Sequence, residues 1–341
     1  MNESSVLRPT LLRAMKISWN YKFLWFFGIF TALVGGSGEF QAIARSFDGL
    51  SLYQRILIAL KNGEATGTLK NIWNLILDIA TTQTFQVVFW AIVLLILTIM
   101  VVMIIIVSQT ALVDSTARVL ENEPISLDTA WLAGMTHFWR MFAITVIGKV
   151  IVVVMYLALT IPLGIGFYST QGAAWNIALV LLSVFVFLPL AVILNFVVRY
   201  AQSYTVIEHQ PMSLSFLSAW KLFRQHWIAS LEMAVAILLA SIIAYLLLVL
   251  GVALVAIPFL GVSFILSLFN FDAIAAIIAN AGIAAAIIWI ALAGSVTSVF
   301  QWSAWVTFFM EIQKGTVRSH LAQFVDRLPL LFQKKRSSVE S

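Results

Sequence analysis

The chain has 341 residues, of which 62% are hydrophobic and 10% are charged, and its formal net charge is +5. Soluble domains are about 45–50% apolar and about 25% charged, so lipid must solvate most of this chain. The lack of cysteine excludes disulfides, thiolate catalysis and cysteine metal sites. Because the basic residues border apolar runs, we expect membrane lipids, and not nucleic acid, to be their partner.

The N-terminus has some features of a cleaved signal peptide. Basic residues precede a short apolar run, and the small residues at 35–38 offer a cleavage site. The segment before this apolar run is long and amphipathic, however, and it matches a pattern that returns later in the chain. We therefore interpret the run as the first membrane helix.

Six apolar runs follow one another along the chain. About 20 helical residues cross a hydrocarbon core of ~30 Å, so every run except the short first one is long enough. Pro258 and Gly261 interrupt the fifth run, and Asp272 separates it from the sixth. We expect 256–280 to be a folded outer connection, either re-entrant or an extra crossing. The runs lie at 23–34, 85–113, 142–167, 177–198, 234–269 and 273–310.

The distribution of charge predicts the orientation. The segments before the first run and after the second, fourth and sixth runs carry 15 of the 20 Lys and Arg residues. The connection 38–84 carries four more, but four acidic residues balance them. The positive-inside rule then predicts a multi-pass protein of the cytoplasmic (inner) membrane with both termini in the cytoplasm. We expect one transmembrane domain at 1–312 and a cytoplasmic basic tail at 313–341, helical at first and then disordered.

An internal repeat divides the predicted membrane domain. Residues 119–127 and 206–214 share the frame V-[LI]-E-x-x-P-[IM]-S-L, and an amphipathic helix with an Ala-Trp pair follows each copy. We predict an all-α fold of about six transmembrane helices in three parallel hairpin repeats, at about 6–121, 126–208 and 213–311, each of which begins with an interfacial helix. The first hairpin has the long outer connection 38–84. The repeat residues are Glu121, Pro124, Ser126, Ala130, Trp131, Glu208, Pro211, Ser213, Ala219 and Trp220.

The repeat frame has a direct structural interpretation. The two prolines would stop the incoming helix, and Ser126 and Ser213 would cap the N-terminus of the interfacial helix. Glu121 and Glu208 oppose the helix dipole, so we expect each to have a partner, either the next helix N-terminus or an arginine. The alternative for these two carboxylates is a role in binding a substrate or ion.

Lys149 and Glu232 are charges inside the predicted spans. Such residues are costly in lipid and are candidate functional residues. Counted along a helix, Lys149 lies ~13 Å from Arg140, and Glu232 lies ~7 Å from Trp227. The alternative is that Lys149 extends to the interface and that Glu232 barely leaves it. A pair between them is a hypothesis, although the two depths do not match well.

No catalytic or metal-binding constellation is found in the sequence. The histidines lack H-x-x-x-H or H-E-x-x-H spacing, and there is no phosphate loop or nucleophile elbow. We expect no metal and no cofactor, and a protein that is not an enzyme. His137 and His226 occupy similar places in two repeats, so they are interpreted as polar edges of interfacial helices. The histidines are His137, His209, His226 and His320.

The pattern of a Glu at a helix end, then a Ser, then Ala-Trp on an amphipathic helix resembles one bacterial group. It is similar to the membrane domain fused to some glycerophosphodiester phosphodiesterases, and to related six-helix integral membrane proteins of unknown function. The opening from Ser18-Trp19 to Trp25 also fits this group. The resemblance implies the membrane part alone, because no soluble phosphodiesterase region is present, and it transfers no catalytic residue.

Three functions are therefore compared. The leading hypothesis is a non-enzymatic membrane protein that binds or organises lipids or partner proteins, a homo-oligomer included, because interfacial helices are predicted on one leaflet. The second is a permease or channel for a small solute or lipid, supported by the repeats and Lys149. The third is a lipid-modifying enzyme, whose acid and base would have to be Glu121, Glu208 or the scattered histidines.

Overall fold

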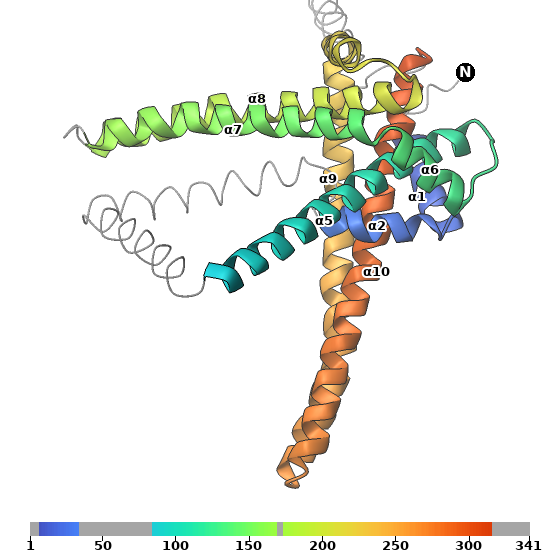
Figure 1. The fold of residues 1–341 in the computed structure, drawn as a ribbon, viewed down its shortest axis with the longest axis vertical. Helices are drawn as coiled ribbons and strands as arrows, with labels where there is room; N and C mark the ends of the chain where they lie inside the picture. Colours follow the sequence, from blue (N-terminus) through green and yellow to red (C-terminus); the bar gives the residue numbers. More distant parts are fainter. Residues whose placement is uncertain (1–6, 34–83, 169–172, 316–341) are drawn as a thin grey trace, which may run out of the picture. The chain divides into compact units, whose positions relative to one another are not determined.

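The computed structural model describes residues 7–33, 84–168 and 173–315, and every regular element in these ranges is an α-helix (Figure 1). Five of these helices are long and apolar enough to cross a membrane, as expected of a multi-pass helical protein. The connection 38–84 and the tail 313–341 lie almost entirely outside the described residues. The helices are α1 (Leu7–Asn20), α2 (Leu24–Leu33), α5 (Thr84–Leu120), α6 (Leu127–Thr136), α7 (Phe138–Tyr168), α8 (Ala173–Ile207), α9 (Met212–Leu268) and α10 (Asp272–Gln313).

The chain forms two compact units. The first unit comprises 1–37, 105–141 and 199–341, and the second comprises 38–104 and 142–198. The unit boundaries fall inside α5, α7 and α8, so the C-terminal parts of α5 and α8 belong to the first unit. The three predicted repeats do not coincide with these units and remain a prediction.

The core of the first unit is built around the C-terminal part of α10. Almost every residue from Ser295 to Ile312 is buried, and α1, α2 and α9 pack against this helix. A hydrogen bond of 3.1 Å between the hydroxyls of Thr116 and Ser303 also holds α5 against α10. Gly28 allows α2 to approach closely, because a Cβ atom there would lie 2.5 Å from Ser295 Oγ.

The α9–α10 hairpin corrects the expectation for 256–280. This segment is not a folded outer connection, because α9 continues through Pro258 to Leu268 and α10 begins at Asp272. The tight turn uses Asn270 with a φ of 60°, a left-handed conformation that Asn tolerates well. Proline is tolerated inside a helix where neighbouring groups satisfy the freed carbonyl, so its presence in an apolar run does not end the helix.

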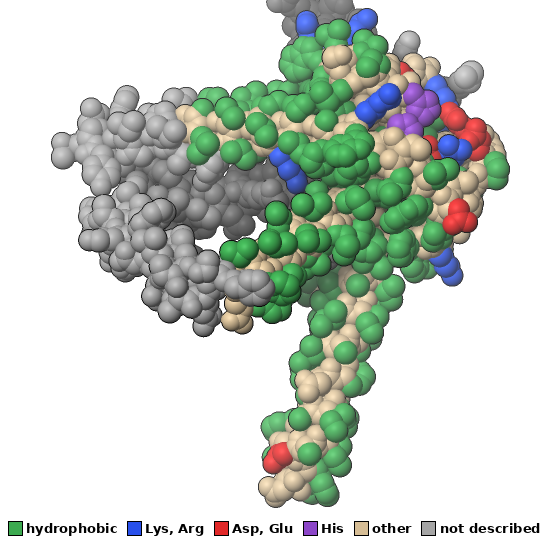
Figure 2. All heavy atoms as spheres, in the orientation of Figure 1, with side chains coloured by type: hydrophobic (Ala, Val, Ile, Leu, Met, Phe, Trp, Pro, Cys, Tyr) green, Lys and Arg blue, Asp and Glu red, His purple; other side chains and the backbone are tan. Residues whose placement is uncertain are grey.

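The hairpin helices are longer than a bilayer requires. α10 has 42 residues and is therefore ~63 Å long, about twice a hydrocarbon core of ~30 Å. Its residues 272–294 are mostly exposed and apolar, whereas 295–312 lie in the bundle core. We call 272–294 and the part of α9 beside it the outer part of the hairpin. Figure 2 shows hydrophobic side chains along this part nearly to the turn. The outer part alone is long enough to cross the hydrocarbon core.

Two histidines mark the junctions between a short helix and a long one. His137 caps α6 with φ −99° and ψ 5°, directly before α7. His226 has φ −128° and ψ 30° and kinks α9 after its first 14 residues, which form the amphipathic start of that helix. The similar places predicted for the two residues in the repeats correspond to the same local feature, a break before a long apolar helix.

In the second unit, α7 packs closely on α8. A Cβ atom at Gly148 would lie 2.7 Å from Val198 Cγ2, so only a glycine fits without a shift. Lys149, the next residue, is exposed on α7. The close packing and the exposed lysine therefore occupy different faces of the same helix.

Candidate functional site

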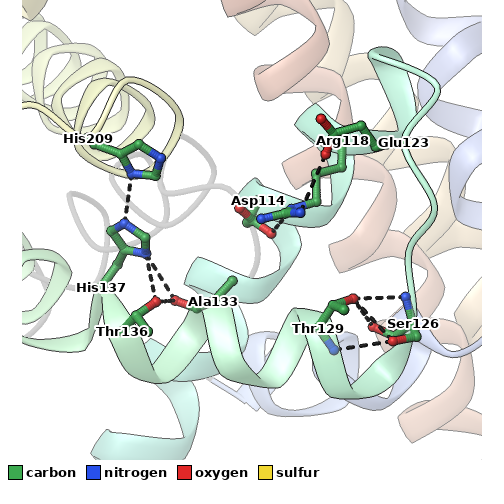
Figure 3. A network of polar contacts seen from close by, with 9 residues as sticks. All are labelled: Asp114, Arg118, Glu123, Ser126, Thr129, Ala133, Thr136, His137 and His209. Atoms are coloured by element: carbon green, nitrogen blue, oxygen red, sulfur yellow. Dashed lines mark hydrogen bonds and ion pairs between the residues drawn. The ribbon is translucent and has the colours of Figure 1, made fainter.

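Ser126 caps α6 as predicted. Its side chain accepts a hydrogen bond from the backbone N–H of Thr129, at 3.3 Å, while its own backbone N–H donates to Thr129 Oγ1, at 3.0 Å (Figure 3). This reciprocal pair is a capping box. The capping box thereby fixes the C-terminal end of the exposed segment between α5 and α6.

The prediction for Ser213 is wrong. The N-cap of α9 is Pro211, which makes no side-chain hydrogen bond, and Ser213 lies exposed in the first turn. Ser215 is the polar anchor instead, since its hydroxyl accepts from Thr205 Oγ1 at 2.8 Å and lies 3.1 Å from the carbonyl oxygen of Pro211. In this copy α9 therefore begins earlier in the frame than α6 does.

The residue after each repeat glutamate ends the incoming helix. Asn122 and His209 have φ values of 60° and 55°, and the backbone N–H of Glu123 donates to Arg118 O at 2.9 Å, which closes the end of α5. Pro124 and Pro211 are exposed and follow this turn. The left-handed residue, together with the proline, therefore terminates both helices.

The repeat glutamates have different surroundings. Glu208 accepts hydrogen bonds from the side-chain amides of Gln210, at 2.6 Å, and of Gln313 at the end of α10. Glu121 is exposed. The related Glu311 on α10 forms an ion pair with Arg13 on α1. Amides and an arginine, and not a helix N-terminus, are thus the partners found for Glu208 and Glu311.

The Ala-Trp pairs orient α6 and the start of α9 in the same way, with the alanine on the buried face. Ala130 and Ala219 are buried at the contact with the bundle. Trp131 is half-buried and stacks on Phe27, with a centroid distance of 6.4 Å, whereas Trp220 is exposed. The small residue permits close packing, and the tryptophan beside it lies toward the edge of the contact.

The predicted intramembrane charges lie in different units. Lys149 belongs to the second unit and is exposed, and Glu232 belongs to the first and is half-buried. Glu232 follows the kink at His226 by six residues, so it lies ~9 Å along α9. A pair between the two remains a prediction, as does a functional role for either.

Arg199 is a residue that the sequence analysis missed. It was assigned to the connection after the fourth run, but α8 continues to Ile207 and Arg199 is only 6% exposed. Its guanidinium carbon lies 4.9 Å from the ring centre of Trp302 and 5.5 Å from that of Trp305. A buried cation is thereby held against two indole rings of α10.

Hydroxyl and amide groups surround this part of α10. The side-chain amide of Gln301 donates to Ser241 Oγ at 2.7 Å. Tyr200 and Ser230 are joined at 2.7 Å, and Thr31 and Ser298 at 2.6 Å. A spacing of three or four residues between the polar and indole side chains of 295–305 is the sequence signal that could have indicated this buried stripe.

A second polar network joins the end of α5 to the following turn (Figure 3). Arg118 donates to the buried Asp114 at 2.8 Å and to Glu123 at 3.4 Å. Asp114 is 7% exposed, so its charge needs such a partner. The network stabilises the helix end and leaves the Asp114 carboxylate already engaged.

His137 and His209 form a further polar contact within the first unit. Their Nε2 and Nδ1 atoms lie 2.9 Å apart, and the rings are stacked with an interplanar angle of 16° (Figure 3). His137 Nδ1 also lies 3.1 Å from Thr136 Oγ1 and 3.2 Å from Ala133 O. Within the described residues no group of His, Asp and Glu could hold a metal ion.

Comparison of the chain with protein-family models, with curated proteins and with solved structures gives no match. The resemblance to the phosphodiesterase-linked membrane domain therefore stays a prediction. The geometry of the polar core and the surface of the short helices is the basis for assigning a function.

Proposed function

We propose that this chain is a non-enzymatic, multi-pass protein of the cytoplasmic (inner) membrane that binds and organises anionic lipids on the side of its cytoplasmic termini. One observation carries the proposal. The exposed surfaces of α1 and of the start of α9 combine basic side chains with large apolar ones. This composition is typical of helices that lie at the headgroup level of a bilayer.

The two helices present the same chemistry. On α1, Trp19 is 61% exposed, and Lys16 lies one turn before it. At the start of α9, Leu217 is 65% exposed, and Lys221 and Arg224 follow on an exposed face. Tryptophan and leucine favour the boundary of the acyl chains, and each basic residue near an anionic surface contributes about 1 kcal/mol. We call these five residues the interfacial surface.

The test is lipid selectivity in a mixed bilayer. Full-length protein is extracted into native nanodiscs from vesicles with equal amounts of phosphatidylglycerol and phosphatidylcholine, and the retained lipids are quantified. Phosphatidylglycerol should be enriched around the wild type and less enriched around the K16Q/K221Q/R224Q variant. The K314Q variant is the matched control, because Lys314 is exposed at the end of α10 and lies outside the interfacial surface. Retained lipid in the bulk ratio, or a stoichiometric protein partner in its place, would refute the lipid proposal.

A permease is the second candidate, favoured by the buried polar stripe of α10. Hydroxyl and amide groups inside a helical bundle are costly in lipid and are common along solute pathways. Uptake into sealed proteoliposomes separates the two functions. Uptake that depends on Gln301 would favour a permease, whereas tight lipid retention without uptake would favour lipid binding.

A further inference from the structure

Helix α6 presents one face to the outside of the first unit. Asp128, Leu132 and Met135 are exposed and follow one another at i, i+4 and i+7, so they lie on the same side of the helix. Leu132 is 64% exposed and Met135 is 44% exposed. We call these three residues the α6 face. It combines two large apolar side chains with a carboxylate.

The α6 face lacks the basic residues that the other short helices have. Two residues after its buried alanine, α1 has Lys16 and the start of α9 has Lys221, whereas α6 has Leu132. No Lys or Arg occurs between Arg118 and Arg140. An anionic membrane surface attracts basic side chains and repels acidic ones. The α6 face therefore does not fit the ligand proposed for the interfacial surface.

Acidic side chains lie on α6 and on the segment before it. Residues 119–139 contain three acids, Glu121, Glu123 and Asp128, and all three are exposed. Arg118 donates to Glu123 at 3.4 Å, whereas Glu121 and Asp128 form no ion pair with another residue that the structure describes. A partner for the α6 face therefore needs apolar side chains for the leucine and methionine and basic ones for the acids.

The end of α10 lies beside the end of α6. His137, the C-cap of α6, contacts His209 at 2.9 Å (Figure 3). The neighbouring Glu208 accepts a hydrogen bond from Gln313 in the last turn of α10. Gly315 follows with a left-handed φ of 68°, which is typical of the residue that ends a helix. The tail 316–341 therefore starts next to the helix that carries the exposed face.

The tail has the composition that the α6 face requires. Residues 316–341 contain five basic and two acidic residues, and Leu321, Phe324 and Leu328 recur at i, i+3 and i+7. This spacing predicts an apolar stripe along one side of a helix. We propose that this stripe docks on the α6 face of the same chain, with the basic residues of the tail toward the acids of 121–128.

The tail is long enough to reach the α6 face within one chain. Helix α6 has 10 residues and is therefore ~15 Å long. The six residues from Gly315 to Leu321 can span about 20 Å when extended. Attachment to the same chain raises the effective concentration of the tail to about the millimolar range, so a weak contact is sufficient. The tail of the same chain is therefore favoured over the tail of a second copy.

The first test measures how well the tail covers Leu132. Full-length Leu132→Cys is placed in nanodiscs of phosphatidylcholine, and its rate of reaction with a soluble maleimide is measured. The K334Q/K335Q/R336Q substitution removes the basic run of the tail. It should raise the rate at least about threefold, because labelling follows the population in which the tail is undocked. Leu217→Cys is the matched control, since Leu217 is 65% exposed on α9, and its rate should not change.

The second test identifies the occupant of the α6 face. Leu132→Cys is combined with Phe324→Cys in the full-length protein, which has no other cysteine, and a short bis-maleimide is added. A link within one chain should form. The matched control combines Leu217→Cys with Phe324→Cys and should link poorly. Links that form only between two chains would overturn docking within one chain and assign the face to the tail of a second copy.

The remaining outcomes separate the tail from the membrane as the occupant. Unchanged labelling of Leu132→Cys in the charge variant would overturn the inference, as would the absence of a link within one chain. Protection of Leu132→Cys that appears only when phosphatidylglycerol replaces half of the phosphatidylcholine would show that the membrane covers the face, and would also overturn it. The inference concerns residues outside the interfacial surface, so these results and the lipid selectivity of the proposed function can fail separately.

Discussion

The guanidinium of Arg199 on α8 lies 4.9 Å from the centre of the Trp302 ring on α10, inside a core rich in hydroxyl groups. The contact joins α8, one residue past the fourth apolar run (177–198), to the buried part of α10 (295–312). A hydropathy profile would place this arginine in a solvated connection. The core of the first unit therefore includes a charged residue that lies just outside the apolar runs.

The cap of α6 gives a direct test of the repeat frame. Ser126→Ala should lower the free energy of unfolding by about 1 kcal/mol, because it removes the side-chain acceptor of the capping box. Ser213→Ala is the matched control from the second copy of the repeat. Ser213 makes no cap, so its replacement should change stability little. Denaturant unfolding in detergent micelles measures both, and equal effects would contradict the difference between the two copies.

The contact between α2 and α10 depends on a glycine. Gly28→Ala should destabilise the protein by about 1–3 kcal/mol, because its Cβ atom would lie 2.5 Å from Ser295 Oγ and 2.6 Å from Ser295 O. Gly261 on α9 has open space around it. Gly261→Ala should therefore be neutral or stabilise the helix by about 0.5–1 kcal/mol. A Gly28→Ala variant as stable as the wild type would show that α2 does not pack there.

The contact between His137 and His209 should hold the junction between α8 and α9. The Nε2 atom of His137 and the Nδ1 atom of His209 lie 2.9 Å apart, and the two rings are stacked. His137→Phe keeps an aromatic ring at this position but removes its nitrogens, so the hydrogen bond is lost. The junction should therefore open more often in this variant than in the wild type.

Hydrogen exchange of residues 207–212 at a single pH measures this effect. Protection should be lower in His137→Phe than in the wild type. Equal protection of the two proteins would contradict the histidine contact.

Much of the architecture follows from patterns that are local in the sequence. The apolar runs predict long helices, and the Ser-x-x-Thr spacing at Ser126 is enough for a cap. The places of His137 and His226 in the repeat correspond to two breaks before long helices. These features depend on neighbouring residues, so sequence alone determines them well.

The errors concern features that depend on contacts between distant segments. The fourth run was ended at Val198, before the charged Arg199, but α8 continues to Ile207. The ring partners of Arg199 lie on α10. Pro258 was treated as a break, although α9 continues past it. Ser213 was assigned the role of Ser126 from the shared frame, yet Pro211 is the N-cap of α9. In each case tertiary contacts or helix continuity outweighed a local signal.

Side-selective cysteine labelling tests the central claim, that the short helices lie on one face of the membrane and the α9–α10 turn on the other. The chain has no cysteine, so single substitutions can be labelled without background. The exposed positions are Met15 on α1, Leu132 on α6, Leu217 on α9 and Ser267 beside the turn. Each variant is treated with a membrane-impermeant maleimide in right-side-out and in inverted vesicles. The account predicts that Ser267→Cys reacts only in right-side-out vesicles and the other three only in inverted ones. Reaction of Leu132→Cys or Leu217→Cys from the same side as Ser267→Cys would contradict it.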